Sequence, residues 1–140
     1  GLLLVETPGR FQVLPGRPLT VLDVGHNPHA ARALRRSLIN LAFAQKRTAV
    51  FSMLSDKDID GVLEIVKDQF DEWYIAPLDV PRGMTAEALQ AKLEAQNIEN
   101  IQTFTSVREA YRAALAKAGE NDRIVVFGSF HTVADVMAAL

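Results

Sequence analysis

Short apolar segments that alternate with helix-like segments constrain the fold of this chain most. The clearest segment, 124–127, reads Ile-Val-Val-Phe, and the segments 19–22 and 48–53 also carry few polar residues. A segment that is apolar at every position is typical of a strand buried on both faces, as in a parallel sheet covered by helices. The sequence therefore predicts an α/β fold, a Rossmann-like three-layer α/β/α sandwich with a mostly parallel sheet of about five or six strands.

Hydrophobic periodicity, caps and turn residues predict the individual elements. We expect strands over 11–14, 19–24, 48–53, 72–76, 101–104 and 123–127, and helices over 28–42, 58–70, 85–96, 106–118 and 132–140. A chain of 140 residues is long enough for one domain with its own core. The chain begins with Gly and shows no signal-peptide pattern. We therefore expect residues 1–140 to be a single domain of a longer protein.

The loops at the carboxyl ends of the strands are the first candidates for function, because open α/β sheets bind ligands there. In the predicted order these loops are 23–28, 52–58, 76–84 and 128–131. Two of the three histidines, His26 and His131, come directly after predicted strands. The sequence therefore predicts a polar functional edge on this side of the sheet.

The segment 23–28, Asp-Val-Gly-His-Asn-Pro, combines reactive side chains with a helix start. Asn27 is a favourable N-cap, and Pro28 suits the first helical position. Such a helix start offers free N–H groups and the positive end of the helix dipole to a phosphate or a carboxylate. Purely structural roles stay open, because Asp23 also fits a turn and His26 also fits a hydrogen bond to loop backbone.

Several classes of function are excluded or disfavoured by composition and by missing motifs. The formal net charge is −2 and the basic residues are scattered, which predicts neither a nucleic-acid partner nor a membrane partner. There is no cysteine, and Asp23 with His26 and His29 is not a convincing ligand set, so we expect no metal site. Neither G-x-G-x-x-G nor G-x-x-x-x-G-K-[ST] occurs. If the domain handles ATP, another domain must supply the phosphate-gripping loop.

Four segments together carry a resemblance to a known family. The segment 23–28 resembles the D-x-A-H-N-P signature of Mur-ligase-like enzymes. It is joined by Pro-Gly-Arg-Phe-Gln at 8–12, Met-Leu-Ser-Asp-Lys-Asp at 53–58 and Val-Phe-Gly-Ser-Phe-His-Thr-Val at 126–133. Over its whole length the chain resembles the carboxyl-terminal domain of the bacterial bifunctional dihydrofolate synthase/folylpolyglutamate synthases. One departure is Gly25, where that family usually has Ala; we expect the loop to keep its course with more freedom.

The resemblance implies a part in an ATP-dependent carbon–nitrogen amide ligase. In that family ATP activates a pteroate or folate carboxylate as an acyl phosphate, and the amino group of L-glutamate then attacks it. The resemblance implies ATP, L-glutamate and dihydropteroate or folate as ligands, and the protein's own amino-terminal domain as partner. That domain holds most of the Mg²⁺ site, so the isolated carboxyl-terminal domain is expected to be inactive. A cytoplasmic location follows from the same resemblance.

The resemblance also assigns nucleotide and catalytic roles. Arg10 and Asp23 are expected to contact ATP, with Asp23 at the ribose. His26 is expected near the phosphates or the incoming glutamate, and it is the one catalytic candidate.

Glutamate contacts are expected at the other end of the chain. Ser129, together with His26, is expected to bind L-glutamate. Lys57 and His131 are further candidates from their location alone. No residue is expected to be a general base, so catalysis rests on positioning and electrostatics.

Two other functions remain open. The chain could be the carboxyl-terminal domain of another Mur ligase, although the segment 128–131, Gly-Ser-Phe-His, disfavours this. Alternatively, it is a freestanding α/β module that binds a small anion or a protein partner without catalysis.

Overall fold

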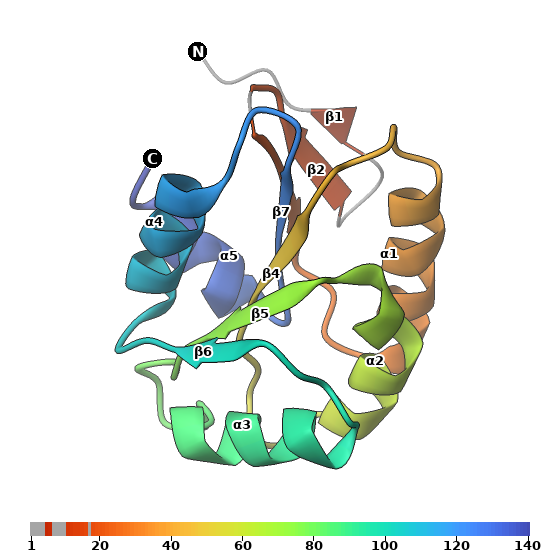
Figure 1. The fold of residues 1–140 in the computed structure, drawn as a ribbon. Coiled ribbons are helices and arrows are strands. Elements are labelled where there is room, and N and C mark those ends of the chain that lie inside the picture. The colour runs from red at the N-terminus through yellow and green to blue at the C-terminus, as the bar shows by residue number, and fades with distance from the viewer. Residues whose placement is uncertain (1–4, 7–10, 17) are drawn as a thin grey trace.

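The computed structural model describes residues 5, 6, 11–16 and 18–140, and these form one sheet flanked by helices (Figure 1). Within the described residues the sheet has seven strands in the order β1-β2-β3-β7-β4-β5-β6. The strands are β1 (Val5–Glu6), β2 (Phe11–Leu14), β3 (Leu19–Asp23), β4 (Arg47–Phe51), β5 (Glu72–Ile75), β6 (Ile101–Thr103) and β7 (Arg123–Phe127).

The five strands from β3 to β6 in this order are parallel, whereas β1 and β2 pair antiparallel at one edge. The predicted α/β class and the mostly parallel sheet are confirmed. The sheet has seven strands where about five or six were expected. The additional strand, β1, is only two residues long and pairs with β2.

The described residues form five α-helices: α1 (Pro28–Ile39), α2 (Ile59–Val66), α3 (Ala86–Ala95), α4 (Val107–Lys117) and α5 (Phe130–Met137). Each begins after an N-cap whose side-chain oxygen accepts a backbone N–H three residues later. The caps are Asn27, Asp58, Thr85, Ser106 and Ser129. These bonds satisfy amides that a helix start leaves unpaired.

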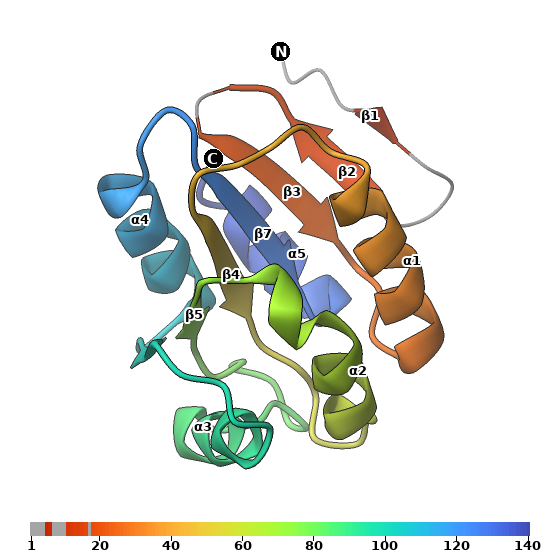
Figure 2. The same ribbon diagram turned by 45° about the vertical axis from the view of Figure 1, so that its right-hand side comes forward.

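The helices form the two outer layers of the predicted sandwich. Side chains of α1, α2 and α3 pack into one apolar core with the first face of the sheet, and those of α4 and α5 pack with the other. Figure 2 shows α5 behind the sheet, on the side opposite α2. Along β4, Ala49 and Phe51 point to the first core and Val50 to the second. This alternation follows from the period of two in a strand.

Four helix boundaries differ from the predictions by two residues or more. Helix α1 ends at Ile39 rather than at residue 42. Helix α2 ends at Val66, and a short 3₁₀ helix, η1 (Lys67–Gln69), completes the segment. Helix α5 begins at Phe130, two residues earlier than expected, because Ser129 caps it, and it ends at Met137 rather than at residue 140. No helix within the described residues is long and apolar enough to cross a membrane.

Because the five central strands are parallel, their carboxyl ends lie at one edge of the sheet. We call the loops 24–27, 52–58, 76–85 and 128–129 the carboxyl edge. Phe51 of β4 pairs in register with Phe127 of β7, and Phe127 pairs with Asp23 of β3. The three strands therefore end at the same level, which brings their loops next to one another.

Candidate functional site

The loop from β3 to α1 is held by two side chains of its own. The Asp23 carboxylate, on a residue only 3% exposed, accepts the Gly25 N–H at 2.7 Å. Asn27 Oδ1 accepts the Ala30 N–H at 2.8 Å, and Pro28 occupies the first helical position. The predicted helix start is confirmed. Asp23 shapes the turn that presents His26, so its carboxylate is already engaged within the chain.

Gly25 lies where no side chain fits without movement. A Cβ atom there would lie 2.4 Å from Ala30 Cβ and 2.8 Å from Asp23 Oδ1. Contacts below 3.0 Å require neighbouring atoms to shift. Glycine therefore allows the loop to pack closely on the first turn of α1. The greater freedom expected of a glycine at this position stays a prediction.

His26 is half-buried, and its ring makes no hydrogen bond with any described residue, whereas His29 on the first turn of α1 is exposed. A half-buried ring at a loop next to a helix start is well placed to meet a ligand. No group of three or more His, Asp or Glu side chains in the described part of the chain gathers in a way that could hold a metal ion.

The loops after β4 and β5 are tied together. Leu54 and Gly83 form an isolated β-bridge, and the Ser55 N–H donates to the Arg82 carbonyl at 2.7 Å. Arg82 also pairs with Asp56 through Nη1 and Oδ2 at 2.6 Å. This pairing across 26 residues was not predicted from the sequence, which contains no local signal for it.

Lys57 and the start of α2 complete this part of the edge. Lys57 is half-buried, and its ammonium group pairs with no carboxylate among the described residues. Asp58 caps α2 through the Gly61 N–H at 3.0 Å. A Cβ on Gly61 would lie 2.9 Å from Pro28 Cγ, so the starts of α1 and α2 pack closely. Lys57 therefore contributes a positive charge beside two helix starts.

The loop after β7 is the most tightly held of the edge. Gly128 has a φ of +122°, and a Cβ there would lie 2.1 Å from the Ser52 carbonyl oxygen. Ser129 is 3% exposed, and its Oγ accepts the Thr132 N–H at 3.1 Å. Beyond the cap, Phe130 is 67% exposed. Its ring lies edge-on to the His131 ring, with 6.1 Å between the ring centroids. Ser129 is thus a buried cap, while His131 is exposed.

Three of the six predicted site residues lie in the carboxyl edge, namely His26, Lys57 and Ser129, and two more, Asp23 and His131, lie next to it at the end of β3 and the start of α5. Arg10, the sixth, lies outside the described residues. The ligand roles of all six remain predictions. Thr132 was not singled out from the sequence, although its spacing of three from Ser129 is the signal by which a cap partner is found.

A groove of about 870 Å³ extends the edge over α4 and α5. It is lined by the loop 77–80, the first turns of α4, and His131 and Asp135 of α5. Arg108 reaches Asp135 through its backbone N–H at 3.0 Å and through Nη2 at 3.3 Å. Sequence reasoning missed this groove, because its walls come from segments far apart in the chain.

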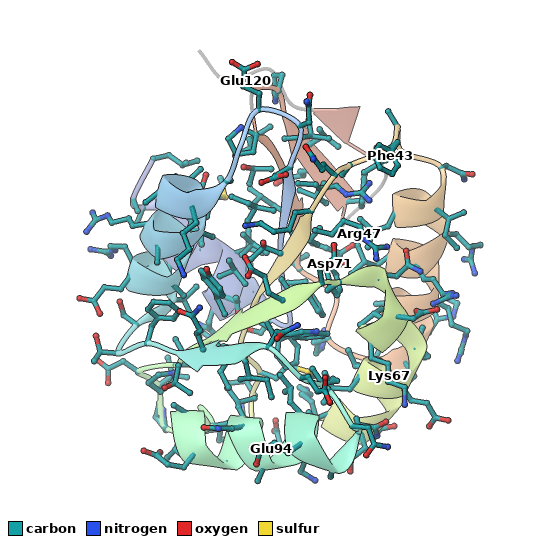
Figure 3. The ribbon with its side chains drawn as sticks, viewed as in Figure 1. Phe43, Arg47, Lys67, Asp71, Glu94 and Glu120 are labelled. Atoms are coloured by element: carbon teal, nitrogen blue, oxygen red, sulfur yellow. The ribbon has the colours of Figure 1, made fainter. Side chains whose placement is uncertain are left out.

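The opposite, amino edge of the sheet carries different features. Figure 3 shows Phe43, which is 91% exposed, on the loop that precedes β4, and Arg47 beside Asp71. Burial raises the pKa of the Asp71 carboxyl, but hydrogen bonds from Arg47 outweigh this and hold the pKa below its usual range. Burial, followed by the charge of Arg47, lowers the pKa of Arg123. These charged groups lie away from the candidate site.

Comparison with known proteins agrees with this architecture. Residues 9–130 match the family model described as the Mur ligase, glutamate ligase domain. The dihydrofolate synthase/folylpolyglutamate synthase of Escherichia coli strain K12 is 44% identical over 140 residues, which is all of this chain and 32% of that protein. That of Haemophilus influenzae is 42% identical over 127 residues, or 88% of this chain and 29% of that protein.

Solved structures show the same fold. Escherichia coli FolC in complex with ADP superimposes with a TM-score of 0.86 at 46% identity, covering 94% of this chain and 31% of that chain. A bifunctional folylpolyglutamate synthase/dihydrofolate synthase with Mn, AMPPNP and L-glutamate bound gives a TM-score of 0.84 at 48% identity. This match covers 96% of this chain and 32% of that chain. The chain thus spans about a third of the relatives it matches. On the match across residues 9–130, the chain belongs to the family of Mur ligase glutamate ligase domains.

Proposed function

We propose that this chain is the carboxyl-terminal domain of a cytoplasmic, ATP-dependent ligase that joins L-glutamate to dihydropteroate or folates. The proposal includes residues 1–140 as one domain of a longer protein, a dihydrofolate synthase/folylpolyglutamate synthase. It is supported by a relative of that name, from Escherichia coli, that aligns with the whole of this chain at 44% identity. The observation that carries it is the convergence of His26, Lys57 and Ser129 at one sheet edge.

The chemistry available at this edge suits anionic reactants. The amino end of α1 has Pro28 at its first position, and its first turn contains no acidic residue that would offset the positive end of the helix dipole. The His26 ring and the Lys57 ammonium group add donors that no described residue occupies. Fixed donors of this kind stabilise charge that develops on phosphate and carboxylate oxygens.

The remaining parts of an ATP site are assigned to another domain. The sequence has no P-loop, and the described residues offer no cluster of three metal-ligating side chains. These residues alone therefore do not fit a Mg²⁺ site, and Mg²⁺ ligands are proposed to lie mainly in the amino-terminal domain. Closure of two domains over the reactants would exclude water that hydrolyses an activated acyl group.

Product identity tests this proposal. The full-length protein is incubated with ATP, L-glutamate and dihydropteroate, and the pterin products are analysed by mass spectrometry. We expect ADP formation that requires both substrates, and a pterin product with one added glutamyl group. Turnover with a peptidoglycan precursor in place of dihydropteroate would assign the chain to another Mur ligase instead.

A further inference from the structure

Three buried residues at the carboxyl edge form a directed hydrogen-bond chain. Thr132 Oγ1 lies 2.8 Å from the Ser52 carbonyl oxygen and 3.0 Å from Ser129 Oγ. The Thr132 N–H lies 3.1 Å from the same Ser129 Oγ. Ser52 and Thr132 are fully buried, and Ser129 is 3% exposed. The chain therefore joins the end of β4 to the first turn of α5 below the surface, and only Ser129 keeps a small exposed fraction.

The direction of each bond follows from counting hydrogens. A carbonyl oxygen only accepts hydrogen bonds, so Thr132 must donate its single hydroxyl hydrogen to the Ser52 carbonyl. In the contact between the two hydroxyls, Ser129 is then the donor and Thr132 the acceptor. The Ser129 hydroxyl hydrogen is thereby used, one Oγ lone pair holds the Thr132 N–H, and one lone pair is left.

A second contact keeps this chain in place. Gly128, just before Ser129, lies so close to the Ser52 carbonyl that any Cβ would collide with it at 2.1 Å. Phe51 and Phe127, the residues before Ser52 and Gly128, pair in register in the sheet. The Ser129 turn is therefore fixed on Ser52 both by close packing and by the Thr132 hydroxyl.

We propose that Thr132 is a positioning residue that sets the direction of the Ser129 hydroxyl, so that Ser129 meets L-glutamate as a hydrogen-bond acceptor. This inference rests on the proposed function and on the predicted contact between Ser129 and L-glutamate. Because its hydrogen is directed at Thr132, Ser129 recognises a donor. The donor on the amino acid is its α-amino group, which is the nucleophile, whereas its two carboxylates only accept.

A ligand that lacks the amino group separates the two orientations. Glutarate keeps both carboxylates of glutamate and has no amine. In the full-length protein, Ser129→Ala is expected to raise the KM for L-glutamate about fivefold, the effect of one neutral hydrogen bond. The inhibition constant of glutarate is expected to stay within about twofold of the wild-type value. An equal weakening of glutamate and glutarate would overturn the inference, because it would make Ser129 a donor to a carboxylate.

A second cap serine serves as the matched control. Ser106 caps α4 through the Glu109 N–H at 3.1 Å, in the same geometry as Ser129 and outside the chain to Ser52. Ser106→Ala is expected to lower the melting temperature and to leave the KM for L-glutamate unchanged. If Ser129→Ala behaves like Ser106→Ala, Ser129 is a cap only and the inference is wrong.

Thr132 itself is tested with an isosteric pair. Thr132→Val removes the hydroxyl at nearly constant shape, and Thr132→Ser keeps it. We expect Thr132→Val to raise the KM for L-glutamate several-fold with the KM for ATP unchanged, and Thr132→Ser to restore the wild-type value. A parallel rise of both KM values, or no rise at all, would overturn the positioning role. A wild-type protein without glutamate-dependent turnover would instead contradict the proposed function itself.

Discussion

Two histidines at the start of α1 show how a small difference in position separates two roles. His26 is half-buried in the loop held by Asp23, whereas His29 is exposed on the first helical turn. Both have the same chemistry, so they make a matched pair for testing the site. The difference in placement, rather than the residue type, is what marks His26 as the candidate.

The first prediction concerns that pair. In the full-length protein, His26→Ala is expected to lower kcat/KM about a hundredfold or more, because a fixed donor in a closed site is worth about 2–4 kcal/mol in the transition state. His29→Ala is expected to stay near the wild-type rate. Steady-state kinetics with circular dichroism on both variants check this. Equal rates for His26→Ala and wild type, with the fold intact, would reduce His26 to a loop residue.

The second prediction concerns the packing of Gly25. Gly25→Ala is expected to destabilise the protein by about 1–3 kcal/mol, because the added methyl group meets Ala30 Cβ at 2.4 Å. Gly119→Ala is the control, since its Cβ would meet only the Asp122 carboxylate, at ordinary distances of 3.6 Å to Oδ2 and 3.9 Å to Cγ. Urea denaturation of the two variants gives the comparison. Similar unfolding free energies for both would show that the loop relaxes freely around residue 25.

At the scale of elements, the helix and strand types were predictable and some ends were not. Apolar segments marked β3, β4 and β7, because burial on both faces leaves a continuous pattern. The start of α5 was missed because Gly128 and Ser129 resemble a turn until the Thr132 N–H is seen to bond to Ser129. Strand β1 was missed because two residues carry no periodicity.

The third prediction concerns an ion pair that joins the starts of β4 and β5. Asp71 accepts the Arg47 N–H at 2.8 Å and Arg47 Nε at 3.3 Å. These bonds hold the Asp71 pKa below its usual range, so they stabilise the fold above that range and are lost as the pH falls through the folded-state pKa. Asp71→Asn is therefore expected to be less stable than wild type at pH 7. The difference in unfolding free energy between the two proteins is expected to shrink below about pH 4.

Unfolding free energies at the two pH values test the ion pair. Asp79→Asn provides the control, because Asp79 is exposed and forms no ion pair with a described residue. For that variant, the difference in unfolding free energy from wild type is expected to stay the same at both pH values. A difference for Asp71→Asn that is constant from pH 7 to pH 3 would mean that the Asp71 charge does not stabilise the fold.

At the scale of the whole molecule, the parallel topology made the position of the candidate edge predictable. The contacts within that edge could not be predicted, because they join segments far apart in the sequence. The parallel strand order places His26 and Ser129 on one edge of the sheet, independently of the conformation of the loops. The Asp56–Arg82 pair and the Thr132–Ser52 bond join segments 26 and 80 residues apart, and only the folded chain shows them. The groove beside α5 arises in the same way.

The central claim is that this chain supplies one part of a composite site for ATP and L-glutamate. The most direct test measures ADP formation with ATP, dihydropteroate and L-glutamate by the full-length protein and by residues 1–140 alone. Cooperative unfolding of the shorter protein must first show that it is folded. We predict glutamate-dependent turnover by the full-length protein and none above the protein-free blank by residues 1–140. Sustained turnover by the purified, folded 140-residue chain, or full-length turnover indifferent to glutamate, would contradict the account.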